Sequence, residues 1–171
     1  MKILVAAILL NFLFSQGISA QQFNLEANYL NVDGEMVVFK PGDKKNKNVV
    51  AYFGHFGIPT DIEKKDGFTI LSYFYIPLTP LSAPSAWNLD EDKVLELVEI
   101  TSEVKGDIYY HFVLTDKLLT ESPLVSYIYS VNKGVIMFEL LTDHPEQFYH
   151  KSYTLIDDFG LGSLQKNGAD R

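Results

Sequence analysis

The sequence predicts a mostly β protein: a single antiparallel β-sandwich or an incomplete up-and-down β-barrel, with one long proline-containing loop. Short runs rich in Val, Ile, Tyr and Phe recur from Phe23 to Ile156 and are separated by Gly, Asn and Asp, whereas apolar residues at helical spacing are scarce. The chain has 171 residues and no cysteine. This length suits one domain that buries enough surface to fold without disulfides.

The start of the chain has the composition of a cleavable secretory signal peptide, which we place at residues 1–20. Lys2 supplies a positive charge, residues 3–14 are predominantly apolar, and small and polar residues lead to Ala20. The apolar run is shorter than the ~20 residues of a transmembrane helix, so we expect no membrane anchor after cleavage. We expect export to the periplasm or the extracellular space, with one β-rich domain at 21–164 and a flexible tail at 165–171.

Nine runs have the residue types of β-strands. One of them, in the segment from Asn88 to Lys105, also has acidic residues at its start and some helical spacing, but its many β-branched side chains favour a strand. The prolines between Ile76 and Asn88 predict the long loop. The expected strands are Phe23 to Asn31, Glu35 to Lys40, Asn48 to Gly54, Phe68 to Ile76, Val94 to Val104, Asp107 to Leu114, Leu124 to Val131, Val135 to Leu141 and Phe148 to Ile156.

Three glycine-containing segments predict tight hairpin turns: Asp33-Gly34, Lys105-Gly106 and Asn132-Lys133-Gly134. A two-residue turn at the second would place Ile100 opposite His111 and Glu99 opposite Phe112.

A three-residue turn at Asn132 to Gly134 would pair Val131 with Val135. It would place Ile128, Ile136, Phe138 and Leu140 on one face of the sheet, with Tyr127, Tyr129 and Met137 on the other. Both faces of these hairpins are then apolar, which predicts that something covers each face.

The net charge of the chain limits the classes of molecule that it could bind. The formal net charge is −8, and the single arginine is the last residue, Arg171. A protein that binds nucleic acid needs clustered Lys and Arg to displace counterions from phosphates. The only basic cluster, Lys44-Lys45-Asn46-Lys47, has the setting of a solvated loop, so we expect no nucleic-acid partner.

Aromatic and acidic side chains supply candidate ligand-binding residues. Tyr127 and Tyr129 share a strand face and could form a stacking platform for a sugar or line an apolar site, although tyrosine is also common in strands for packing alone. Trp87 could cap a pocket. Glu99, beside Tyr110 in the expected hairpin, could anchor a ligand if it is buried against aromatic rings.

A weaker pattern is compatible with a metal site. Asp143, His144, Glu146 and His150 lie close in sequence and offer the donor types of metal sites. Their spacing matches no established ligand motif, and an exposed turn explains it equally well. We expect no cofactor.

These observations favour an exported, non-catalytic β-protein that binds a small apolar or sugar-like ligand or an envelope or extracellular protein. Two alternatives stay open: a secreted hydrolase, with or without metal, and a structural component of an envelope assembly.

Overall fold

The computed structural model describes residues 23–42, 48–71, 73–103, 106–118, 123–144 and 147–164. They form one sheet of twelve antiparallel strands in the order β6-β5-β4-β3-β2-β1-β12-β11-β10-β9-β8-β7. The signal peptide and tail expected from the sequence lie outside the described residues. The strands are β1 (Ala27–Leu30), β2 (Met36–Pro41), β3 (Asn48–Phe53), β4 (Phe56–Lys65), β5 (Phe68–Leu71), β6 (Phe74–Pro77), β7 (Ser85–Asn88), β8 (Lys93–Ser102), β9 (Ile108–Asp116), β10 (Pro123–Ser130), β11 (Gly134–His144) and β12 (Gln147–Leu155).

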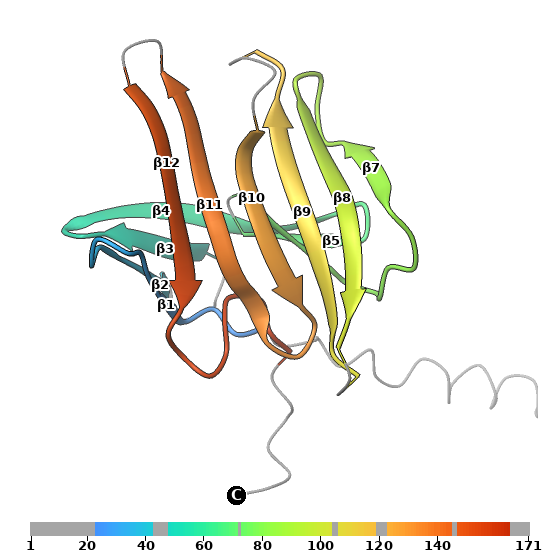
Figure 1. Ribbon diagram of the computed structural model, residues 1–171, viewed down its shortest axis with the longest axis horizontal. Helices are drawn as coiled ribbons and strands as arrows, with labels where there is room; N and C mark the ends of the chain where they lie inside the picture. The colour runs from blue at the N-terminus through green and yellow to red at the C-terminus, as the bar shows by residue number, and fades with distance from the viewer. Residues whose placement is uncertain are drawn as a thin grey trace, which may run out of the picture.

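The sheet curls into a half-barrel, so that one face of it becomes the interior. Figure 1 shows β8 to β12 side by side in one layer, with β1 to β5 crossing behind them. The described residues contain no helix, which confirms the predicted mostly β fold and the incomplete barrel. None of them forms a helical span of the length and hydrophobicity needed to traverse a bilayer.

Aromatic rings fill the space between the two layers. Phe138 of β11 lies at the centre, with its ring 5.0 to 6.3 Å from the rings of Tyr29, Phe39, Phe74 and Tyr153. These rings come from β1, β2, β6 and β12 and are all buried. Burial of such side chains stabilises the fold by about 1.5–3 kcal/mol each, so the concave face is the hydrophobic core.

The two ends of the sheet meet across this core. Trp87 of β7 packs edge-to-face on Phe68 of β5, with ring centroids 4.9 Å apart. The ammonium group of Lys65, at the end of β4, donates a hydrogen bond of 2.6 Å to the carbonyl of Leu89, just after β7. Side chains therefore join β7 and the residue that follows it to β5 and β4, which are not neighbours of β7 in the sheet.

Most of the predicted strands are confirmed, including the choice of strand over helix before Gly106, but three details are wrong. The run Phe68 to Ile76 forms two strands, β5 and β6, and the proline-containing loop ends in a short strand, β7. No strand was expected between Gly54 and Phe68, where the ten-residue strand β4 forms and includes Pro59.

The register of two hairpins also differs from the prediction. The turn before β9 is closed by a hydrogen bond from the amide of Glu103 to the carbonyl of Asp107, which makes it longer than two residues. Glu99 consequently lies opposite His111, not Phe112. In the next hairpin a bulge between β10 and β11 pairs Ile128 with Met137.

The bulge also decides which side chains enter the core. Tyr127 pairs with Phe138, and Tyr129 pairs with Val135; all four are buried on the concave face. Directly opposed residues share one face of a sheet. The expectation that Phe138 lies on the face opposite to the two tyrosines is therefore wrong. The convex face keeps partly exposed apolar side chains, so cover is present on the concave face of these described strands only.

Candidate ligand-binding site

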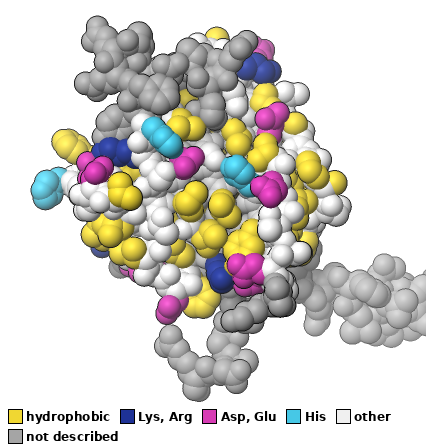
Figure 2. Space-filling model, viewed as in Figure 1, with side chains coloured by type: hydrophobic (Ala, Val, Ile, Leu, Met, Phe, Trp, Pro, Cys, Tyr) yellow, Lys and Arg dark blue, Asp and Glu magenta, His cyan; other side chains and the backbone are white. Residues whose placement is uncertain are grey.

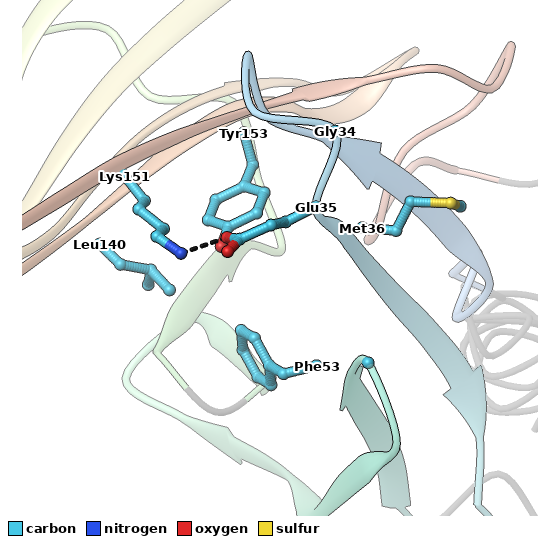
Figure 3. Close-up of a pocket in the computed structure, with 8 residues that line it drawn as sticks. Gly34, Glu35, Met36, Phe53, Leu140, Lys151 and Tyr153 are labelled. Atoms are coloured by element: carbon cyan, nitrogen blue, oxygen red, sulfur yellow. Dashed lines mark hydrogen bonds and ion pairs between the residues drawn. The ribbon is translucent and has the colours of Figure 1, made fainter.

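An open pocket of about 560 Å³ lies on the concave side, beyond the end of the aromatic core. It is formed where the β1–β2 and β3–β4 turns approach β11 and β12, and Figure 3 shows its lining. The lining residues are Gly34, Glu35, Met36, Phe53, Gly54, Leu140, Lys151 and Tyr153.

The β1–β2 turn holds Glu35 at the rim of this pocket. The side-chain oxygen of Asn31 accepts hydrogen bonds from the amides of Asp33 (3.0 Å) and Glu35 (2.8 Å). Gly34 adopts a φ of +82°, a conformation that glycine enters without strain. The amide group of Asn31 also donates to the Glu35 carboxylate at 3.0 Å. One asparagine therefore sets both the turn and the direction of the acidic side chain.

Lys151 pairs with Glu35 from the opposite wall. The lysine lies on β12 in phase with Tyr153, so its side chain is on the concave face and is 17 % exposed. Its ammonium group donates a hydrogen bond to the Glu35 carboxylate, and Figure 3 shows both side chains converging there. This hydrogen bond is the main reason that the pKa of Glu35 lies below its ordinary value, and hydrogen bonds from Asn31 and Tyr153 act in the same direction.

The remaining walls are apolar and continue beyond the pocket. Leu140 lies directly opposite Lys151 in the β11–β12 pair, while the Met36 side chain points away from the ion pair (Figure 3). Phe53 is opposite Phe56 in the β3–β4 hairpin, and Ile58 is opposite the buried Ala51.

Opposed residues share a face, so Phe56 and Ile58 extend the concave apolar surface past Phe53. They are 79 % and 55 % exposed. We call Phe53, Phe56 and Ile58 the apolar ledge. The site thus combines one ion pair, an apolar pocket and an apolar strip that is open to solvent.

A smaller groove of about 290 Å³ lies on the convex face, over β8 to β11. Glu99 and Glu103 line one side and Ile128 and Ile136 the other, with the ring of Tyr109 among its lining residues. Figure 2 shows this face, where hydrophobic side chains gather in the middle among acidic and histidine side chains.

One end of this groove already holds a cation of the chain itself. The Lys133 ammonium group is 5.4 Å from the centre of the Tyr109 ring and donates to its hydroxyl group at 2.8 Å. Asp107 lies 3.8 Å from the same ammonium group. The hydrogen bond with Tyr109 is the main cause of a raised pKa for Lys133.

The aromatic residues singled out in the sequence lie mostly in the core. Tyr110, Tyr127 and Tyr129 are buried, and burial raises the pKa of Tyr127 and of Tyr129. The three hydroxyl groups bond to the backbone of Leu81, Tyr75 and Gly162. Their contacts in this structure are those of residues that tie loops and strands to the core.

The other two candidates for ligand binding lie apart from each other. Trp87 is partly buried against Phe68. Glu99 is exposed in the convex groove, where its carboxylate accepts a hydrogen bond of 3.1 Å from Thr101.

The residues considered for metal binding are described only in part. The imidazole of His150 is exposed, with Nε2 3.5 Å from the carboxylate of Glu139. Glu146 and the side chains of Asp143 and His144 lie outside what the structure describes. Within the described part of the chain, no three His, Asp or Glu side chains come together in a way that could hold a metal ion.

The sequence reasoning missed the concave pocket, because its residues come from four separated parts of the chain. One local signal was present: Lys151 stands in phase with Tyr153 and Leu155 on β12, and a lysine on an otherwise apolar strand face indicates a buried partner or a site. Compared with known proteins, the chain matches no family model, and neither the curated proteins nor the solved structures contain a significant match.

Proposed function

We propose that this chain is an exported, non-catalytic β-protein that binds a small amphipathic ligand in the concave pocket. One observation carries the proposal: the pocket opens directly onto the apolar ledge, whose Phe56 and Ile58 are left largely in solvent. Leaving such side chains in water forgoes about 1.5–3 kcal/mol of burial each. A ligand that covers the ledge recovers part of this energy.

The chemistry of the lining also supports binding. Ligand pockets are typically apolar with a few well-placed polar groups that orient the ligand. Here Phe53, Leu140 and Tyr153 supply the apolar surface, and the Glu35–Lys151 pair supplies the polar end. The length of the ledge suits an aliphatic or ring-containing molecule that reaches from the ion pair toward Ile58.

A neutral apolar dye tests this proposal. We expect Nile red to bind the mature protein with an increase in fluorescence. The substitution Phe56→Ser should weaken dye binding about tenfold, because a phenyl group contributes on the order of 1.5–3 kcal/mol to the binding free energy when a ligand covers it. Phe56 is 79 % exposed, so the variant should fold normally.

The matched control is Leu118→Ser, since Leu118 is 74 % exposed but lies two residues after the end of β9 and is not part of the pocket lining. This control should leave dye affinity unchanged. Absence of dye binding, or equal losses in the two variants, would contradict the proposal.

A further inference from the structure

We propose that the pocket selects amphiphiles whose head group forms hydrogen bonds but has no net charge, such as a long-chain alcohol or a monoacylglycerol, over fatty carboxylates and amines. This inference rests on the proposed function and adds the rule by which the polar end of the ligand is chosen. It is drawn from the ion pair between Glu35, at the rim of the pocket, and Lys151 on its opposite wall.

The polar end of the pocket carries no net charge. Among the described residues, Glu35 and Lys151 are the only charged side chains that line the pocket, and they form an ion pair with each other. Their charges cancel. The polar end therefore offers donors and an acceptor at short range without a net charge to be neutralised by a ligand.

Neighbouring side chains hold the Glu35–Lys151 pair in place. The carboxylate of Glu35 also receives a hydrogen bond from Asn31, and a hydrogen bond from Tyr153 contributes to its ionisation. The Lys151 side chain is 17 % exposed. Glu35 is 50 % exposed, so turning Lys151 toward an anionic ligand costs the hydrogen bond between the two side chains and does not bury an unpaired charge.

A charged ligand head group meets a like charge at the Glu35–Lys151 pair. A carboxylate that bonds to Lys151 must lie beside the carboxylate of Glu35, and an ammonium group that bonds to Glu35 must lie beside Lys151. Like charges at such distances repel each other, even at the effective dielectric of a protein surface. A hydroxyl group avoids both conflicts, because it can donate to Glu35 and accept from Lys151. The net charge of −8 disfavours anionic ligands further.

Three probes with the same ten-carbon tail test the rule: 1-decanol, decanoate and protonated decylamine. Each is titrated below its micelle concentration at pH 7.5 against the mature protein loaded with Nile red, and displacement is measured. We expect 1-decanol to compete at least about tenfold more strongly than either charged probe.

Two variants should reverse this order in opposite senses. Glu35→Gln removes the carboxylate that would repel an anionic head, so decanoate should gain about tenfold relative to 1-decanol. Lys151→Met removes the ammonium group that would repel a cationic head, so decylamine should gain instead. Glu63→Gln is the control: it removes the same charge from an exposed position on β4 outside the pocket, and should keep the native order.

The outcomes distinguish a failure of the head-group rule from a failure of the proposed ligand binding. Decanoate or decylamine competing as well as 1-decanol in the native protein, or an unchanged order in both folded variants, would overturn the head-group rule while dye binding at Phe56 still supports the function. Failure of 1-decanol to compete with bound dye also overturns the rule. Failure of the dye itself to bind overturns both. Should neither variant fold, the native order alone decides.

Discussion

The hydroxyl group of Tyr127 joins two strands that are 52 positions apart in sequence. It accepts a hydrogen bond of 3.0 Å from the amide of Tyr75 and donates one of 2.9 Å to the carbonyl of the same residue. Tyr75 lies on β6, the last strand at one end of the sheet. A single buried oxygen thus satisfies backbone groups that would otherwise lie at an unpaired edge.

Tyr127→Phe should therefore lower the free energy of unfolding by about 1–3 kcal/mol, because it leaves the amide and carbonyl of Tyr75 without partners. Urea denaturation measures the change. Tyr73→Phe is the matched control, since Tyr73 is 52 % exposed on the neighbouring turn; its effect should stay within about 0.5 kcal/mol. A Tyr127→Phe variant as stable as the control would remove this role for the hydroxyl group.

The same residue shows what the sequence could reveal at this scale. Alternation correctly placed Tyr127 and Tyr129 on one face, because the side-chain period of a strand is fixed. It could not show that this face is the interior. Nor could it show that Phe138 shares this face, because that depends on the bulge between β10 and β11. A bulge adds one residue to one strand and has no strong local sequence signal.

At the scale of elements, the turn between β4 and β5 depends on its backbone conformation alone. Asp66 and Gly67 both have positive φ, +50° and +81°, as a two-residue hairpin requires. No atom lies within 4 Å of a Cβ added at Gly67. Gly67→Ala should destabilise the protein by about 1 kcal/mol through strain only, as thermal or urea unfolding will show. Asp66→Asn should be neutral, because asparagine tolerates this region; equal stability of Gly67→Ala and the native chain would refute the argument.

The strand that precedes this turn illustrates why part of the fold escaped prediction. β4 is exposed along most of its length, so its sequence lacks the alternation that marks a half-buried strand, and it contains Pro59. Proline is tolerated there because residues 56–61 pair with β3 only, while β5 pairs with residues 62–65. The strands that the sequence indicates most clearly, such as β9 and β11, are those whose inward side chains form the core.

At the scale of the whole molecule, the tyrosines of the core make stability depend on alkaline pH. Burial raises the pKa of Tyr29, Tyr127 and Tyr129 above the ordinary value of 10.0. The unfolded chain releases these protons near pH 10, whereas the folded chain retains them. The free energy of unfolding should thus be unaffected by these groups below about pH 10. Above it, stability should fall by ~1.4 kcal/mol per pH unit for each tyrosine, until the folded pKa is reached.

Urea titrations from pH 8 to 11.5 measure this slope. Tyr129→Phe should reduce it by the contribution of one tyrosine, and a flat profile up to pH 11.5 would contradict the assignment of buried, protonated tyrosines.

Contacts between distant segments also explain why the site was not found in the sequence. Glu35, Phe53, Leu140 and Lys151 meet only because β1 pairs with β12 and so joins the first hairpins to the last. Antiparallel neighbours along the chain follow from turn chemistry, but the pairing of the first strand with the last does not. Curling of the sheet is equally non-local, since it depends on contacts such as Trp87 with Phe68.

Pro59 affects how readily copies of the protein associate at high concentration. Within the described part of the chain, no strand pairs with the edge of residues 56–59 that faces away from β3, and the apolar side chains of Phe56 and Ile58 are largely exposed there. An exposed strand edge of this kind can pair with the edge of another copy, and repeated pairing builds a fibre. A ring in place of one amide hydrogen interrupts that template, so the apolar ledge can stay exposed to solvent beside an edge that pairs poorly with another copy.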